Sequence, residues 1–511
     1  MPDMYQELIK LADSEMYPFH MPGHKRNLES TPMKGAFRCD ITEIDDFDNL
    51  HDEKGLILEA EKRANKLYGA DKTFFLVNGS TSGVLSAVSA VVHKGGTVLA
   101  ARGSHKSFYH SAYLRNLNIE YLPYKINTKF NIPEGYKTED IMLALNKYDS
   151  EETNISAVFL TSPTYEGKVS DIEKISKVCH DKDIPLIVDA AHGAHFCLKG
   201  FPKSAVEQGA DVVIHSLHKT LPSMTQTALM HVQGDLVDAD RIKRFLRIYQ
   251  SSSPSYVLMA SIDECVKEMM QNGVEFADRL LDYRKRIQLE TRDCKNIEIP
   301  SPDDIQDAAK VLIYVKNGAM TGQRLYDILR EEYKLQLEMA GDKCALAIIS
   351  GWDTEEGIGR LIFAIREIDD KISQRMSDSC EYSRKISNSK NGYRNSESGN
   401  ICEVRLPGRA MSLTEAWDGE KEVIPISLIV EELRNTDKNT QYLNKGYLPE
   451  DGMTKYIAGE FINLYPPGIP IIVPGEIITE QILNDITKYL DEGLNVQGVT
   501  DRKEIICVKQ K

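Results

Sequence analysis

The stretch VIHSLHKTLPSMTQTALMHV (residues 213–232) places a lysine, Lys219, directly after a run of strand-forming residues. The apolar residues of 212–216 and 228–232 predict two strands of a buried sheet. A lysine ammonium at the end of a buried strand is poorly solvated, so it needs either a charged partner or a chemical role. The residues that gather around Lys219 decide between the two.

Strand and helix patterns alternate on the N-terminal side of this stretch. Five further strands are predicted, at Thr73 to Val77, Thr97 to Ala101, Ile119 to Pro123, Ala157 to Thr161 and Pro185 to Asp189. Helical stretches separate most of them, and this alternation predicts an α/β fold with a mainly parallel sheet. Ligands of such sheets bind at the carboxyl ends of the strands.

The chain is 511 residues long, which exceeds one hydrophobic core and predicts about three compact units. We expect a large α/β domain, a small α+β domain and a C-terminal α+β domain. The predicted divisions are an N-terminal segment at 1–60, the large domain at 61–285, the small domain at 286–372, a Ser/Asn-rich linker at 373–400 and the C-terminal domain at 401–511.

Composition excludes several classes of function. Lys plus Arg number 62 against 77 Asp plus Glu, and the net charge of −15 argues against a nucleic-acid surface while favouring cationic ligands. Nine scattered cysteines show neither a CxxC pair nor metal-ligand spacing, so we expect free thiols and no metal. No run of eighteen apolar residues occurs, so we expect a soluble, cytoplasmic protein with no membrane partner.

Three of the predicted strand ends carry polar or reactive side chains. They are Ser80 and Thr81 after the first strand, Asp189 with His192 and His195 after the fifth, and Ser216, His218 and Lys219 at the sixth. Hydroxyls at the start of a helix form either an anion site or a helix cap. A carboxylate at a strand end either caps a helix or holds a cationic partner.

One ligand, pyridoxal phosphate, would explain all three strand ends. Its pyridinium nitrogen suits Asp189, and its aldehyde forms a Schiff base with a lysine amine, here that of Lys219. A flat partner for the ring is offered by His105, at the end of another predicted strand, for which a buried core histidine is the alternative interpretation. The hydroxyls that suit its phosphate are those of Ser80, Thr81 and Ser216.

Nine stretches, in order along most of the chain, resemble the Orn/Lys/Arg decarboxylase family. This family has the fold type I (aspartate-aminotransferase-like) architecture, and the resemblance is to the short form without an N-terminal wing domain. The stretches are PFHMPGHK (18–25), DNLH (48–51), GADKTFFLVNGSTSG (69–83), SHKS (104–107), SPTYEGKVSDI (162–172), VDAAHGAHF (188–196), SLHKTLPSMTQTALMH (216–231), SSSPSYVLMASID (251–263) and YPPGIPIIVPGE (465–476).

The resemblance implies decarboxylation of a basic L-amino acid to an amine and CO₂, feeding polyamine synthesis. Arginine is the favoured substrate, with lysine or ornithine next. Lys219 would carry the Schiff base, Asp189 would meet the pyridine nitrogen and His105 would stack on the ring. The proton that returns to Cα could come from His105, His218 or Lys219. The remaining cofactor contacts would be Ser80, Thr81, His192, Ser216, His218 and Ser252, the last from a neighbouring subunit of a homodimer or a multiple of dimers.

Two other functions stay open at this point. An aminotransferase of the same fold would clamp the substrate carboxylate with an arginine, typically from a strand of the small domain. The strand ALAIISGWD (345–353) has no arginine, although Arg360 follows on the next predicted helix. A relative that binds the cofactor without catalysis is the third possibility, and the intact set of Lys219, Asp189 and His105 opposes it. The fold alone does not choose between these functions.

Acidic residues near the C-terminus are candidates for recognising the distal charge of the substrate. We expect Glu476, in the stiff proline-rich turn, to lie near the mouth of the site, with a cap on the final helix as the alternative. Glu415 and Asp418 are further candidates, with a solvated acidic surface as the alternative. Two departures from the family pattern are Ala190, where a glutamate is common, and an insertion near 433–456.

Overall fold

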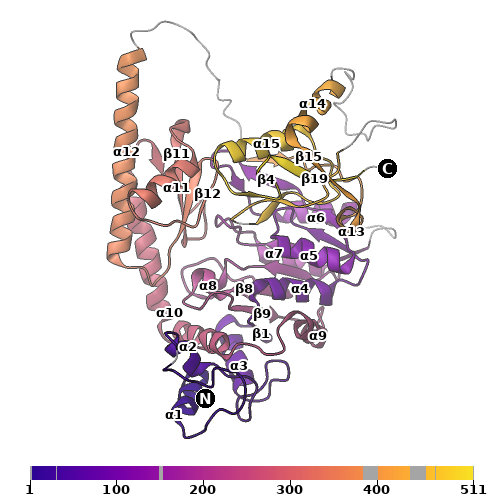
Figure 1. Cartoon of the computed structure of the whole chain (residues 1–511), viewed down its shortest axis with the longest axis vertical. Coiled ribbons are helices and arrows are strands. Elements are labelled where there is room, and N and C mark those ends of the chain that lie inside the picture. Colours follow the sequence, from indigo (N-terminus) through magenta and orange to yellow (C-terminus); the bar gives the residue numbers. More distant parts are fainter. Residues whose placement is uncertain are drawn as a thin grey trace.

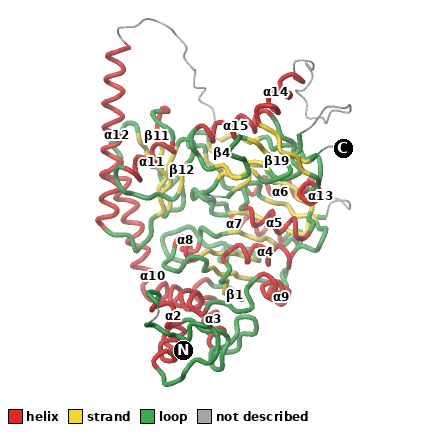
Figure 2. Tube along the Cα trace, viewed as in Figure 1, coloured by secondary structure: helices red, strands yellow, loops and turns green. Residues whose placement is uncertain are grey.

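The computed structural model describes residues 3–29, 31–148, 154–383, 401–437, 456–466 and 468–509. Its centre is a seven-stranded sheet in the order β1-β9-β8-β7-β6-β2-β3. Figure 1 labels β1, β8 and β9 of this sheet, and Figure 2 colours the strands yellow. The strands are β1 (Lys72–Leu76), β2 (Thr97–Ala100), β3 (Asn118–Tyr121), β6 (Ile155–Thr161), β7 (Leu186–Asp189), β8 (Val212–Ser216) and β9 (Ala228–Val232). Within this sheet β9 is antiparallel to both of its neighbours, and the other pairings are parallel. The predicted mainly parallel α/β fold is therefore confirmed.

Helices cover both faces of this sheet because successive residues of its strands point to opposite faces and are apolar on both. Val98 packs with the helices of one face, whereas Leu99 packs with those of the other. The first face carries α4 (Gly79–Val91), α5 (Lys106–Arg115) and α9 (Ala239–Tyr249), and the second carries α6 (Thr138–Lys147) and α7 (Ile172–His180). Gly83 allows α4 to pack closely, since a Cβ there would lie 3.1 Å from Ile214 of β8.

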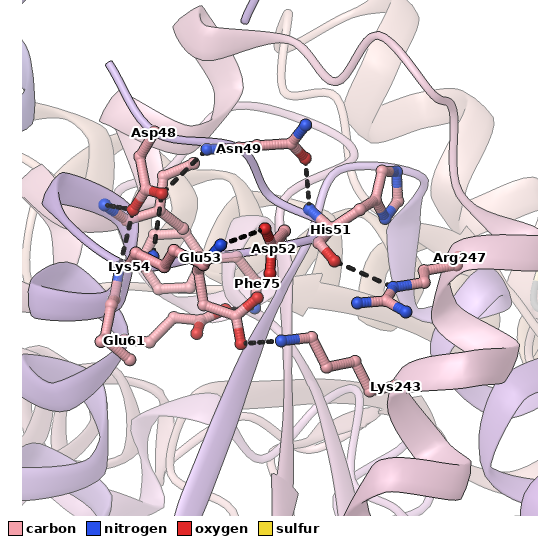
Figure 3. Close-up of polar contacts among 12 residues, drawn as sticks. Asp48, Asn49, His51, Asp52, Glu53, Lys54, Glu61, Phe75, Lys243 and Arg247 are labelled. Atoms are coloured by element: carbon pink, nitrogen blue, oxygen red, sulfur yellow. Dashed lines mark hydrogen bonds and ion pairs between the residues drawn. The ribbon is translucent and has the colours of Figure 1, made fainter. Parts of the chain in front are cut away.

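The N-terminal segment packs against the large domain through α1 (Met4–Asp13), α2 (Lys34–Cys39) and α3 (Leu56–Tyr68). The Asp48 carboxylate accepts the backbone N–H groups of Gly55 and Ile57, so it caps the start of α3 in place of a side chain at Gly55 itself (Figure 3). Glu53 pairs with Lys243 of α9, as Figure 3 also shows. Polar contacts therefore join the loop at 45–55 to α3 and to α9.

The small domain is built on a four-stranded antiparallel sheet. Its order is β10-β11-β13-β12, formed by β10 (Ile297–Glu298), β11 (Lys310–Val315), β13 (Cys344–Ile348) and β12 (Met339–Ala340). Its helices are α11 (Gly322–Glu331) and the long α12 (Glu355–Ser383), while α10 (Tyr256–Thr291) connects it to the large domain across the boundary predicted at 285 (Figure 1).

Helix α12 corrects the predicted linker. Residues 373–383 were assigned to the linker from their polar composition, yet they continue the helix to Ser383. The physical reason is that no glycine or proline occurs between 360 and 391, so nothing in this polar stretch stops the helix. The rest of the predicted linker, 384–400, lies outside the described residues.

The C-terminal region joins the large domain directly. Strand β14 (Ile401–Val404) pairs with β4 (Tyr124–Asn127), which also pairs with β5 (Ile132–Pro133). The region's own elements are α13 (Leu413–Asp418), β15 (Lys421–Pro425), α14 (Ile426–Asp437), β16 (Ile462–Leu464), β17 (Ile469–Ile472), α15 (Glu480–Asp491), β18 (Val496–Gln497) and β19 (Glu504–Val508). Most of the predicted insertion at 433–456 lies outside the described residues.

Two general properties bear on the sequence predictions. Every cysteine whose side chain the structure describes is a free thiol. Among the described helices, none combines the length and the apolar character that crossing a membrane requires.

Candidate active site

The site forms at the carboxyl ends of β7 and β8, which are neighbours in the sheet. Asp189 is the last residue of β7, and Lys219 lies on α8 (Leu217–Thr220), a single turn directly after β8. Lys219 Nζ is 2.9 Å from Nε2 of His192, which follows Asp189 by three residues. The structure therefore brings together Lys219, Asp189 and His192 because parallel strands end at one edge of the sheet.

Burial shifts the pKa values of Lys219 and Asp189. It lowers the pKa of the Lys219 amine, although the nearby carboxylates of Asp189 and Glu338 oppose that effect. It raises the pKa of Asp189, which is 5% exposed, while the charge of Lys219 lowers it. A lysine with a lowered pKa is more often in its neutral form, which is the nucleophilic form of the amine.

His105 and His218 are both held by local contacts. His105 stands at the N-cap of α5, with Nδ1 2.9 Å from the Ser107 hydroxyl. Burial, together with the positive charges of Lys219 and Lys106, lowers the pKa of His105 to about 3, so its ring is neutral at pH 7. His218 Nδ1 donates to the Thr227 carbonyl at 3.0 Å, and burial lowers the pKa of His218 as well.

The predicted phosphate contacts lie at the start of α4 and at the end of β8. Ser80 and Thr81 occupy the first turn of α4, whose N-cap residue, Asn78, makes no side-chain cap. The Ser216 hydroxyl is buried, and among the described residues it has no hydrogen-bond partner. Uncapped helix N–H groups beside an unpaired buried hydroxyl fit a phosphate group. Ser252 is exposed in a loop whose Ser251 N–H donates to the Asn78 side chain of the same chain.

A cavity of about 460 Å³ opens in front of Lys219. The large domain lines it with His192, His218 and Lys219. The small domain lines the other side with Glu338, Trp352 and Asp353. The sequence did not indicate Glu338, Trp352 or Asp353, because no local pattern tells which loop of the small domain faces the large one.

Two further residues near Lys219 were also missed. The Tyr165 ring centroid lies 5.8 Å from Lys219 Nζ and 4.4 Å from the His192 ring. Lys310 Nζ lies 2.9 Å from Nδ1 of the same histidine. A signal for Lys310 existed in the sequence, since it is a lysine inside the apolar strand AKVLIYV (309–315), just as Lys219 is a lysine at the end of one.

Several expected residues lie elsewhere. His195 is buried against Asp307, with 2.8 Å between Nε2 and Oδ1, and does not line the cavity. Arg360 donates to the carbonyls of Tyr333 and Lys334, so it is not placed to clamp a substrate carboxylate. The remaining acidic candidates are engaged within α13 and around it: Glu415 forms a capping box with Ser412, and Asp418 accepts the Tyr113 hydroxyl.

The prediction for Glu476 is wrong. Glu476 is 1% exposed and forms an ion pair of 2.9 Å with Arg102, so it cannot present its carboxylate at the mouth of the cavity. The alternative interpretation is also wrong, because Thr479 is the residue whose side chain caps α15. Arg102 is buried shortly after β2, and a buried guanidinium needs a counter-ion. The Glu476 carboxylate supplies that negative charge.

Arg102 fastens the proline-rich turn onto the large domain. Its guanidinium donates to the carbonyls of Pro470 (2.8 Å) and Ile471 (3.1 Å) in addition to pairing with Glu476. The Lys106 N–H donates to the Gly468 carbonyl at 3.2 Å. A Cβ at Gly468, which has a φ of +83°, would lie 3.4 Å from His105 Nε2. The stiff turn therefore forms a wall beside His105.

We expect Glu476→Gln to destabilise the protein rather than to weaken substrate recognition. The change leaves the buried charge of Arg102 without its counter-ion, which typically costs about 3 to 5 kcal/mol. Thermal melting of the cofactor-free protein measures it, with Glu415→Gln on the exposed capping box as the control, expected to cost about 1 kcal/mol or less. An unchanged melting temperature combined with a lowered kcat/KM would restore a role in recognition.

The mainly parallel sheet, with a lysine and a carboxylate at adjacent strand ends, defines an α/β enzyme fold of the fold type I kind. Among solved structures, the lysine decarboxylase of Francisella novicida has a similar fold, with a TM-score of 0.76 and 18% identity over 99% of this chain and 81% of that chain. A serine palmitoyltransferase of Sphingomonas wittichii has a TM-score of 0.51 over 62% of this chain and 77% of that one.

The family model described as "Orn/Lys/Arg decarboxylase, major domain" matches residues 2–342. The arginine decarboxylase of Bacillus subtilis is 30% identical over 98% of this chain and 95% of its own length. A lysine decarboxylase of Pseudomonas aeruginosa is 26% identical over 56% of this chain and 43% of its own length. The chain belongs to the Orn/Lys/Arg decarboxylase family.

Proposed function

We propose that this protein is a pyridoxal-phosphate-dependent enzyme that decarboxylates a basic L-amino acid, arginine in the first place, to the corresponding amine and CO₂. Membership of the family supports the reaction, and the match to an arginine decarboxylase along almost the whole chain favours arginine over lysine and ornithine. The cofactor, when bound, supplies an electron sink for the electrons that remain when CO₂ leaves Cα.

The observation that carries this proposal is that Lys219 and the carboxylates of Glu338 and Asp353 line one cavity. Glu338 and Asp353 line the side opposite Lys219 and suit the cationic end of a basic amino acid. No arginine is among the described residues that line the cavity, which supports a decarboxylase over an aminotransferase that clamps the α-carboxylate with an arginine. A carboxylate that is to leave as CO₂ is better placed without such an ion pair.

Each site residue has a proposed task. When pyridoxal phosphate is bound, Asp189 would hold a proton on the ring nitrogen, Lys219 would bind the aldehyde and His105 would cover the ring. Ser80, Thr81, Ser216, His218 and Ser252 are the proposed phosphate ligands. His105 is neutral at pH 7, so it is a weak source for the proton that returns to Cα. Burial lowers the pKa of His218 as well, so the freed Lys219 ammonium is better suited to that step.

The proposal also covers the assembly of the protein, its location and its pathway. We infer a homodimer or a multiple of dimers in the cytoplasm, with a role in polyamine synthesis. Size-exclusion chromatography with light scattering measures the assembly. A monomer that is fully active would contradict the contribution of a neighbouring subunit to the site.

Product analysis tests the reaction. The purified protein, loaded with pyridoxal phosphate, is given arginine, lysine and ornithine, and amine and CO₂ are measured. Citrulline and norleucine are matched controls, since they resemble arginine and lysine in length and lack the distal charge. We expect amine and CO₂ from arginine and at least about a hundredfold lower kcat/KM with citrulline. Formation of a keto acid in place of CO₂ would favour the aminotransferase.

A further inference from the structure

The DNLH stretch (48–51) belongs to the family resemblance and has no task in the proposed function. Its last residue, His51, has Nε2 at 2.8 Å from the Ser251 carbonyl oxygen. Because a carbonyl oxygen only accepts, the imidazole donates this hydrogen bond, either as the neutral ring with hydrogen on Nε2 or as the charged ring. His51 therefore holds the backbone of a loop that lies 200 residues further along the chain.

The backbone of His51 is itself held on both sides. Its N–H donates to the side-chain oxygen of Asn49 at 2.7 Å, and its carbonyl accepts from Nε of Arg247 on α9 at 2.9 Å, as Figure 3 shows. These two contacts fix the part of the chain that carries the imidazole against the large domain.

The N–H of Ser251 contacts the residue that precedes α4. It donates to the Asn78 side-chain oxygen at 3.0 Å. Gln250 holds the same segment in place, since its side chain accepts the Val77 N–H at 2.8 Å and donates to the Phe75 carbonyl at 3.2 Å. Strand β1 is at the edge of the sheet, so its outward backbone groups have no neighbouring strand and bond to this segment instead.

This contact changes what Asn78 does for α4. Asn78 is the N-cap residue of the helix, and asparagine is among the residues that cap helices best. Its side chain nevertheless makes no cap, and its oxygen accepts from Ser251 instead. The Gly79 N–H donates to the Gln226 carbonyl at 2.9 Å. The N–H groups of the next two residues, the proposed phosphate contacts Ser80 and Thr81, are left uncapped.

We propose that His51 is a positioning residue for the phosphate of the cofactor. By holding the Ser251 carbonyl, it keeps the Ser251 N–H on the Asn78 side chain and keeps that side chain away from the N–H groups of Ser80 and Thr81. Without the imidazole the loop is released, Asn78 turns to cap α4, and a phosphate must displace this cap before it binds. The inference rests on the proposed function, since it takes the start of α4 as the phosphate site.

The test compares two ligands that differ only in the phosphate group. Cofactor-free protein is titrated with pyridoxal phosphate and with pyridoxal, and the absorbance of the bound aldehyde gives both dissociation constants. In His51→Leu, we expect the affinity for pyridoxal phosphate to fall about five- to thirtyfold, as for a helix cap that must be displaced, and the affinity for pyridoxal to stay within about twofold of the wild type. His51→Gln places an amide donor where Nε2 lies and should restore both affinities to within about threefold.

Two more variants assign the effect to Asn78. Asn78→Ala removes the side chain that would form the cap, so in this background His51→Leu should change the affinity for pyridoxal phosphate by no more than about twofold. Ser251→Pro removes the N–H that holds Asn78 and leaves His51 intact, so it should weaken binding of pyridoxal phosphate as His51→Leu does. Because Ser251 is exposed, this variant also serves if His51→Leu fails to fold.

His180→Leu is the matched control, because His180 also bonds through Nε2, to Asp211 at 2.9 Å, and lies on α7 across the sheet from α4. It should lower the melting temperature and leave the ratio of the two affinities unchanged. An unchanged ratio in His51→Leu and Ser251→Pro, or an undiminished effect of His51→Leu in the Asn78→Ala background, would overturn the inference. If the wild type binds pyridoxal phosphate no more tightly than pyridoxal, it is the proposed phosphate site that fails.

Discussion

Lys219→Ala is expected to abolish the borohydride-stable adduct with pyridoxal phosphate and to lower turnover by on the order of 10⁴-fold or more. The reason is that, in the proposed function, the amine both binds the cofactor aldehyde and is a candidate source of the returning proton. Absorbance of the bound cofactor, peptide mapping of the trapped adduct and amine production measure the three consequences separately.

Peptide mapping is the most informative of these three measurements because two lysines flank His192. Both Lys219 and Lys310 lie 2.9 Å from a ring nitrogen of that histidine, so a trapped adduct must be assigned to one of them. Lys174→Ala, which changes an exposed lysine on α7, serves as the control and should leave trapping and turnover unchanged. An adduct on Lys310 in the wild type would transfer the reactive role to that residue.

Asp189→Asn is expected to slow decarboxylation by about 10²- to 10³-fold while cofactor binding and trapping on Lys219 persist. Asp189 is the carboxylate at the end of β7, and its buried charge lies close to Lys219. An amide cannot stabilise the proton on the ring nitrogen, so the bound cofactor becomes a weaker electron sink. Single-turnover measurements on fully loaded protein isolate this effect from cofactor loss.

A matched substitution is available on the same sheet. Asp211 is buried, accepts the Leu186 N–H at 2.8 Å and pairs with His180, which makes it structural rather than part of the cavity. Asp211→Asn should lower the melting temperature and leave the single-turnover rate of loaded protein near that of the wild type. Equal rates for the two asparagine variants would mean that another group holds the proton on the ring nitrogen.

The sheet was predictable because its signals are local. Strands β8 and β9 have the predicted bounds, and the others differ from prediction by one or two residues at one or both ends, since buried strands are continuous apolar runs bounded by polar residues. The meeting of Asp189 and Lys219 followed from the rule that parallel strands end at one edge. Candidate residues that lie at strand ends could therefore be predicted from the sequence.

Roles that depend on distant partners were not predictable. Glu476 looked like a free carboxylate because its partner, Arg102, lies 374 residues earlier in the chain. The small-domain wall of the cavity, with Glu338 and Asp353, depends on how two domains pack, which no periodicity reports. Helix α12 is longer than predicted because polar composition indicates solvent exposure and does not by itself mark the end of a helix.

The clamp between Arg102 and the turn at 465–476 has a consequence for protein synthesis. Strands β7 and β8, whose ends position Asp189 and Lys219, leave the ribosome long before Gly468, which completes the wall beside His105. Domains fold largely in the order of their translation. We therefore expect the cleft of a nascent chain to stay open until the turn at 465–476 is synthesised. A chain truncated before Gly468 would contain Lys219 and His105 but would lack the wall beside His105.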